Sequence, residues 1–120
     1  MLGIIGAMEV EVEKLRAKMT ETEMKTVAGM NFCRGKLEGK DVVIVRSGIG
    51  KVNAAMCAQI LADVYHADHV INTGIAGSLK AEINIGDIVL STDALQHDMD
   101  AQAFGYEPGQ IPRVDTLSFK

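Results

Sequence analysis

The chain has 120 residues and a formal net charge of −4 at pH 7, from 12 basic and 16 acidic side chains scattered along it. A length within the ~50 to 200 residues of one domain predicts a single domain, and the scattered charge disfavours nucleic acid or an anionic membrane as a partner. No apolar run reaches the ~20 residues that span a bilayer, and Cys33 and Cys57 lack the paired spacing of a zinc site, so we expect a cytoplasmic protein with two reduced thiols.

The first elements are predicted to be a strand at residues 2–7 and a helix from residue 8 to about residue 19. Apolar side chains recur three and four positions apart in the helix, at Met8, Val12, Leu15 and Met19. Acidic side chains fill its first turns, where the helix macrodipole favours negative charge, and a solvated structural role explains Glu9 and Glu13. The sequence therefore predicts a strand followed directly by an amphipathic helix.

The middle of the chain contains short apolar runs separated by glycine turns. Strands are predicted at residues 24–28, 31–37 and 41–46, which together form a β-meander. Residues 50–66 are predicted to form a second helix. Its buried stripe is expected to consist of Val52, Met56, Ile60 and Val64, widened by Ala55 and Leu61.

Two more strands are predicted after the second helix. The first lies at residues 69–72, and the second begins after a turn at Gly86 and Asp87, covers residues 88–91 and continues to residue 95. Beyond Gln96 the chain becomes polar and rich in turn-forming residues, which predicts an extended loop.

Three of the apolar runs, which end at Ala7, Val45 and Ile71, pass directly into glycine-containing turns. In open α/β sheets, ligands bind outside the carboxyl ends of the strands, where glycine lets the backbone approach a ligand closely. A carboxylate delivered to that edge, as Glu11 would be, can activate a water molecule for hydrolysis. The sequence therefore predicts a small-molecule site with Glu11 as its candidate base.

Four motifs occur in order along the chain: Gly6-Ala7-Met8 with Glu11, Ser47-Gly48-Ile49-Gly50-Lys51-Val52, Asn72-Thr73-Gly74-Ile75-Ala76-Gly77, and Phe104-Gly105-Tyr106-Glu107. Together they closely resemble the bacterial 5′-methylthioadenosine/S-adenosylhomocysteine nucleosidases of the purine nucleoside phosphorylase superfamily. The resemblance implies an α/β fold with three layers, α/β/α, around a mixed central sheet. It also implies that residues 1–120 are one nucleoside phosphorylase-like domain, of which only the amino-terminal portion is present. We therefore expect a truncated chain that is inactive by itself.

The resemblance also implies roles for individual residues in hydrolysis of the N-glycosidic bond, a reaction that releases adenine and needs no cofactor or metal. Glu11 would activate the attacking water. The residues that would bind substrate are Ala7 and Met8 beside the water, Ile49 near the thioalkyl arm, and Ile75, Ala76 and Gly77 beneath the ribose and purine. The family forms homodimers, and Ala101, Phe104 and Pro112 map to contacts with the neighbouring subunit's site. Some relatives carry serine where Ile75 stands.

Alternatives remain beside this hypothesis. Glu11 and Phe104 could be structural residues, and the chain could be a phosphorolytic enzyme or a half-domain that only binds or dimerises. A Walker loop is disfavoured by Val45 and Val52, and the segment His97–Asp100 lacks a second cluster that would complete a metal site. Burial beside Met8 is expected to favour the acid form of Glu11.

Overall fold

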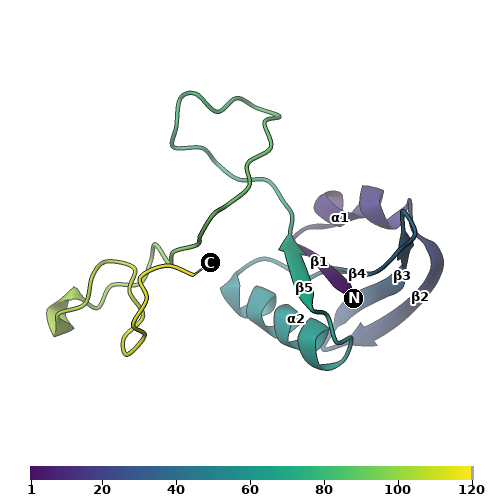
Figure 1. The fold of residues 1–120 in the computed structure, drawn as a ribbon, viewed down its shortest axis with the longest axis horizontal. Helices are drawn as coiled ribbons and strands as arrows, with labels where there is room; N and C mark the ends of the chain where they lie inside the picture. Colours follow the sequence, from purple (N-terminus) through teal and green to yellow (C-terminus); the bar gives the residue numbers. More distant parts are fainter. Residues whose placement is uncertain (120) are drawn as a thin grey trace. The chain divides into compact units, whose positions relative to one another are not determined.

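The computed structural model describes residues 1–119 and divides them into two compact units, Met1–Gly77 and the segment from Ser78 onward (Figure 1). The elements of the first unit are β1 (Leu2–Gly6), α1 (Glu9–Arg16), β2 (Thr20–Val27), β3 (Met30–Leu37), β4 (Lys40–Arg46), α2 (Lys51–Asp63) and β5 (His69–Asn72). The second unit contains a short 3-10 helix, Gln102–Phe104, and an isolated antiparallel bridge between Ala94 and Phe119.

The strands of the first unit form a five-stranded sheet in the order β2-β3-β4-β1-β5. Strand β1 runs parallel to both β4 and β5, with Ile4 opposite Ile44 on one side and Ile71 on the other. Strands β2, β3 and β4 are antiparallel neighbours, which confirms the predicted meander and the mixed sheet. Because β1, β4 and β5 are parallel, their carboxyl ends lie at the same edge of the sheet.

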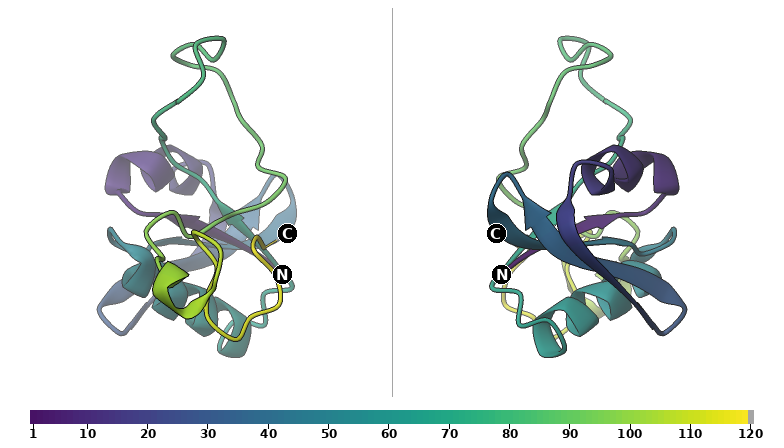
Figure 2. Two further views of the ribbon diagram at one scale, coloured as in Figure 1. Left: turned by 90° about the vertical axis from the view of Figure 1, so that its left-hand side faces the viewer. Right: turned by 90° about the vertical axis from the view of Figure 1, so that its right-hand side faces the viewer.

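The two helices cover opposite faces of this sheet, as Figure 2 shows. On the α2 face, Ile5 and Phe32 pack in one buried cluster with Leu61. On the α1 face, Ile4 packs in a second cluster that includes Val12. Neighbouring residues of one strand therefore enter different cores, which explains why the central strands are apolar without alternation. The three-layer α/β/α arrangement predicted from the sequence is confirmed.

The two hairpins of the meander turn on the dipeptides Ala28-Gly29 and Glu38-Gly39. In both turns the two residues have positive φ, 50° and 77° in the first and 49° and 77° in the second. Two consecutive positive φ angles give the turn whose twist matches that of paired strands, and glycine adopts this conformation at little cost. The predicted glycine turns therefore fix the register of the meander.

The boundary between α1 and β2 lies earlier than the sequence predicted. Helix α1 ends at Arg16, and β2 begins at Thr20 although the strand was expected to begin at residue 24. Met19 is buried in the α1-face cluster from a position beyond the helix. The apolar spacing that suggested three further helical residues thus reflects a shared core rather than a continuous helix.

The buried face of α2 also differs from the prediction. Of the predicted stripe, Leu61 is fully buried and Ile60 packs against the core, but Val52, Met56 and Val64 are 83%, 39% and 45% exposed. Cys57, which was not predicted, is fully buried. A Cβ placed on Gly3 would lie 2.9 Å from Leu61 Cδ1, so glycine at this position of β1 leaves the space that Leu61 occupies.

No helix within residues 1–119 has the length and apolarity needed to cross a membrane.

The strand expected at residues 88–95 does not form. Only Ala94 is bridged, with hydrogen bonds of 2.8 and 2.9 Å to Phe119, and Ile88 and Leu90 are 90% and 87% exposed. A strand is stable when a neighbour takes up its backbone N–H and C=O groups, and within residues 78–119 no neighbouring strand does so for residues 88–91.

Candidate functional site

The candidate site lies at the carboxyl ends of β1, β4 and β5. Backbone hydrogen bonds continue past the strands there: Ser47 N–H donates to Gly6 O at 2.9 Å, and Thr73 N–H donates to Ile5 O at 2.8 Å. The buried Ser47 hydroxyl also donates to Gly48 O at 2.8 Å, which holds the turn after β4. These bonds bring the three glycine-containing turns together at one edge, where the sequence predicted a small-molecule site.

Glu11 lies in the first turn of α1, and its side chain folds back toward the end of β1. Its Oε2 accepts a hydrogen bond from Met8 N–H at 2.8 Å. Its Oε1 accepts a second from Ile75 N–H, in the loop after β5, at 3.2 Å. The carboxylate therefore joins the turn after β1 to the loop after β5, although Glu11 and Ile75 are 64 positions apart in the sequence.

The electrostatics of Glu11 correct the prediction that its acid form would be favoured. The pKa of Glu11 lies below its ordinary value, first because Met8 N–H donates to the carboxylate and next because Ile75 N–H does. Burial acts in the opposite direction and is outweighed, since the side chain is partly exposed. The carboxylate is therefore ionised and reachable from solvent, so it can accept a proton, while its lowered pKa makes it a weaker base than an ordinary glutamate.

The other predicted site residues fall into two groups. Ala7 and Met8 lie between β1 and α1, and Ile49 lies before α2 with 74% of its surface exposed. Ile75, Ala76 and Gly77 follow β5 and are exposed. These residues all belong to the first unit and to the three turns around Glu11. The second unit holds Ala101, which is buried, Phe104, which is 83% exposed on the 3-10 helix, and Pro112, which is exposed.

Gly6 and Gly74 lie beside Glu11 and were not predicted as site residues from the sequence. A Cβ placed on Gly6 would lie 3.1 Å from Glu11 Cβ, and one placed on Gly74 would lie 2.6 Å from Glu11 Oε1. Both glycines belong to recognised motifs, which was the available signal. The contact of Gly6 with Glu11 is local to the turn between β1 and α1, whereas that of Gly74 could not be inferred because it depends on the pairing of β1 with β5.

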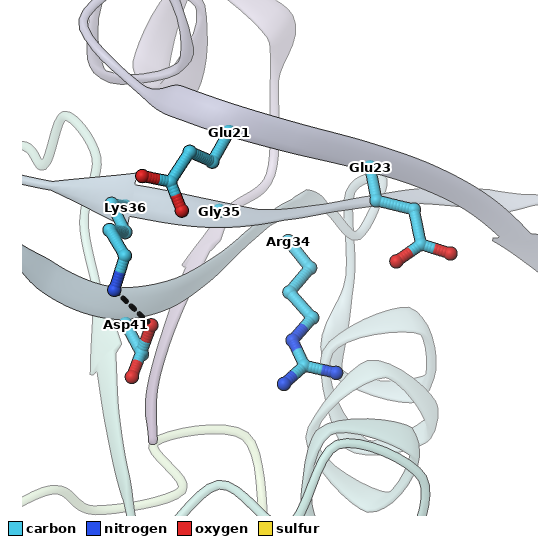
Figure 3. Close-up of a pocket in the computed structure, with 6 residues that line it drawn as sticks. All are labelled: Glu21, Glu23, Arg34, Gly35, Lys36 and Asp41. Carbon is cyan, nitrogen blue, oxygen red and sulfur yellow. Dashed lines mark hydrogen bonds and ion pairs between the residues drawn. The ribbon is translucent and has the colours of Figure 1, made fainter.

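A hollow of about 220 Å³ lies elsewhere, on the meander (Figure 3). It is lined by Glu21, Glu23, Arg34, Gly35, Lys36 and Asp41. Figure 3 shows Lys36 and Asp41 directed toward each other, in an ion pair of 3.2 Å. Asp41 is near the start of β4, whereas the candidate site lies at the end of that strand. The hollow is an open, mixed-charge surface, and no group of three or more potential metal ligands occurs within residues 1–119.

Comparison with known proteins shows relatives that match nearly the whole chain in sequence and fold. The sequence profile of the phosphorylase superfamily matches residues 1–119. A 5′-methylthioadenosine/S-adenosylhomocysteine nucleosidase of Shewanella loihica is 53% identical over 110 residues, which are 92% of this chain and 48% of that protein.

Two crystal structures of such nucleosidases resemble the chain closely. The enzyme of Colwellia psychrerythraea, in complex with adenine, superimposes with a TM-score of 0.95 at 50% identity, over 98% of this chain and 48% of that one. The enzyme of Neisseria meningitidis, in complex with methylthio-immucillin-A, gives a TM-score of 0.94 at 42% identity, over 98% of this chain and 51% of that one. The chain spans about half the length of these relatives.

Proposed function

The chain belongs to the phosphorylase superfamily, and we propose that it supplies the Glu11 side of an active site that hydrolyses 5′-methylthioadenosine and S-adenosylhomocysteine. The bond cleaved is the N-glycosidic bond, and the products are adenine and the corresponding thioribose. The similarity to 5′-methylthioadenosine/S-adenosylhomocysteine nucleosidases supports the substrate class. The position of Glu11 supports the reaction type.

In this proposal Glu11 acts as the general base. It takes a proton from a water molecule whose oxygen attacks the anomeric carbon of the ribose, while the bond to the purine nitrogen breaks and its electron pair leaves with adenine. Departure of adenine requires a proton from an acid on the leaving-group side, and we assign none of residues 1–119 to that role. A base that acts on the water and a separate acid that acts on the leaving group are the two groups of an inverting mechanism.

The single observation that carries the proposal is the hydrogen bonding of the Glu11 carboxylate. Met8 N–H and Ile75 N–H each bond one of its oxygens, at 2.8 and 3.2 Å, and both bonds favour the anion. Each carboxylate oxygen has a second lone pair, so the group can still accept a hydrogen bond from a water molecule. The Met8 and Ile75 N–H groups thus orient the Glu11 carboxylate and leave it able to accept a hydrogen bond from water.

The neighbouring side chains suit a thioether nucleoside. Ile49, exposed beside α2, would contact the thioalkyl arm by burial and dispersion, the interactions that a methylthio group offers. Ala7 and Met8 would line the water position. Ile75, Ala76 and Gly77 would form the wall beneath ribose and purine, with Ile75 contributing its backbone N–H to Glu11.

We also propose a cytoplasmic homodimer in which Phe104 and Pro112, both exposed, reach the neighbouring site, whereas Ala101 is buried in its own chain. The exposed position of Phe104 on its 3-10 helix and the two free, buried cysteines support these assignments. In a complete chimera with the Shewanella loihica nucleosidase, mixing Glu11→Gln subunits with Phe104→Ala subunits would place an intact Glu11 and an intact Phe104 around one shared site. Recovery of activity on mixing supports the dimer, and additive loss contradicts it.

The proposal is tested in a chimera in which this chain replaces the matching segment of the Shewanella loihica nucleosidase. Glu11→Gln should lower kcat for adenine release by at least about 10²-fold, the usual loss for a general base, while nucleoside binding persists. Glu13→Gln is the matched control, because Glu13 is an exposed carboxylate of the same helix. Turnover near that of the control in the Glu11→Gln chimera would refute the assignment.

Dependence on phosphate separates hydrolysis from phosphorolysis. Glu11 and Glu13 carry negative charge at the start of α1, which opposes binding of a phosphate dianion, whereas the charge of Glu9 is offset by ion pairs with Arg16 and Arg46. The chimera should therefore release adenine at the same rate in phosphate and in a non-coordinating buffer. A strict requirement for phosphate, with formation of a ribose 1-phosphate derivative, would identify a phosphorylase.

A further inference from the structure

The loop after β5 passes directly against the carboxylate of Glu11, and Gly74 is the residue at the contact. A Cβ at this position would lie 2.6 Å from Oε1, 3.0 Å from Cδ and 3.4 Å from Oε2 of Glu11. At a distance below 3.0 Å one of the two groups must shift, and the atom at the contact is the flexible end of the Glu11 side chain, so a side chain at residue 74 would displace the carboxylate. The absence of a Cβ therefore permits the observed position of Glu11.

The backbone conformation of Gly74 does not require glycine. Gly74 is not among the glycines with positive φ, so alanine could adopt its backbone angles without strain. The reason for glycine at this position is the space that the Glu11 carboxylate occupies. In the same loop, Gly77 would meet nothing within 4 Å, which shows that the crowding is specific to position 74.

Hydrogen bonds hold the loop on both sides of Gly74. Thr73 N–H donates to Ile5 O at 2.8 Å and extends the pairing of β5 with β1. Ile75 N–H donates to Glu11 Oε1 at 3.2 Å. An added methyl group would therefore push on the carboxylate and on the Ile75 hydrogen bond together.

We propose that Gly74 is a positioning residue for Glu11: its lack of a side chain lets Ile75 N–H reach the carboxylate and fixes where the base stands. The catalytic part of this inference rests on the function proposed above. The geometric part does not, because the contact can be tested in the 120-residue chain by itself. A displacement of the base by about 1 Å lowers turnover by up to about 10²-fold in enzymes.

The first experiment measures the pKa of Glu11 by ¹³C NMR titration in the 120-residue chain. Gly74→Ala should raise the pKa of Glu11 toward its ordinary value, because the Ile75 hydrogen bond is lost. Gly39→Ala is the control, since that position has φ 77° and nothing within 4 Å: it strains a turn far from the site and should leave the titration unchanged. An unchanged pKa of Glu11 in Gly74→Ala would overturn the proposal.

Stability coupling keeps the proposal testable if Gly74→Ala is poorly folded. Glu11→Ala removes the carboxylate that the new methyl group would meet. Gly74→Ala should therefore lower the midpoint of urea unfolding in the parent chain and should lower it much less in the Glu11→Ala background. Equal losses in both backgrounds would show that Gly74 acts through some contact other than Glu11, and would also overturn the proposal.

Activity in the chimera completes the test. Gly74→Ala should lower kcat by about 10-fold to 10²-fold with a smaller change in KM, and adding it to Glu11→Gln should cause no further loss. Multiplicative losses in the double variant would contradict a role through Glu11. If Glu11→Gln alone retains activity, the proposed function fails, while the titration and the stability coupling still decide whether Gly74 positions the carboxylate.

Discussion

The apolar runs Val42–Val45 and Ile88–Leu90 have similar compositions and opposite environments. In the first unit, Val42, Val43, Ile44 and Val45 are all at most 1% exposed. In the second unit, Ile88, Val89 and Leu90 are 90%, 65% and 87% exposed. The difference follows from their neighbours: β4 is paired on both sides, with β3 and β1, and lies between two helices, whereas residues 88–91 pair with no strand of residues 78–119. Hydrophobicity alone therefore does not decide whether a segment becomes a buried strand.

Strand β5 shows an intermediate case within the first unit. Its backbone pairs with β1 on one side, and its apolar residues Val70 and Ile71 are 45% and 49% exposed. Pairing has fixed the strand without burying it. The loop that meets Glu11 continues from this strand, so the site depends on an element held mainly by backbone hydrogen bonds.

The largest expected effect that tests this comparison is at Phe32. This side chain is fully buried in the α2-face cluster and stacks on Tyr65, with ring centroids 5.1 Å apart. Phe32→Ala should lower the free energy of unfolding by about 3 to 5 kcal/mol, measured by urea denaturation with circular dichroism. Phe104→Ala, in the second unit and 83% exposed, should change it by less than about 0.5 kcal/mol. Similar losses from the two variants would contradict the difference between the units.

A matched pair of valines tests the two apolar runs directly. Val43→Ala removes methyl groups from a fully buried side chain and should lower the free energy of unfolding by about 2 kcal/mol. Val89→Ala removes the same groups from a side chain that is 65% exposed and should cost less than about 0.5 kcal/mol. A large loss at Val89 would show that residues 88–91 are buried in solution.

Features that depend on local sequence could be predicted. The hairpin turns at Gly29 and Gly39 follow from two-residue turn chemistry, and the predicted meander is confirmed. The mixed sheet and the three layers, which the family resemblance implied, are confirmed as well. The rotation of α2 could not be predicted, because apolar or small residues occur on several of its faces and the contact between Gly3 and Leu61 decides which of them is buried.

The candidate site also has features that could be predicted from the sequence and features that could not. Glu11 could be selected as a candidate from its place after β1, and its catalytic role stays a prediction. The largest cause of its lowered pKa, the Met8 N–H, lies three residues away, whereas the second cause, the Ile75 N–H, comes from 64 residues away and could not be found from neighbours in sequence. The role of Gly74 was hidden for the same reason.

The reaction rate of Cys57 with a thiol reagent measures how often α2 separates from the sheet in the first unit. Cys57 is fully buried between α2 and the sheet, and burial raises the pKa of its thiol to about 11. At pH 8 only about one thiol in a thousand would be ionised, so a Cys33→Ala chain should react with a thiol reagent at least about 10²-fold more slowly when native than in urea. Equal rates would mean that α2 separates readily from the sheet.

The smallest expected effect is at the exposed end of β5, where Asp68 pairs with the amino group of Met1 at 3.0 Å. Hydrogen bonding from this amino group, and next from His69, lowers the pKa of Asp68 to about 2. A pKa below the unfolded value of about 3.9 stabilises the fold above that pH, and the contribution disappears as pH falls through about 2. Asp68→Asn should therefore lower Tm near neutral pH, and only slightly, because solvent screens an exposed ion pair. The difference should vanish in strong acid, where Asp68 is protonated. Melting curves of this variant and of Asp115→Asn, an exposed control in the second unit, measure the effect. A difference that is as large at pH 2 as at pH 7 would show that the ion pair is not its source.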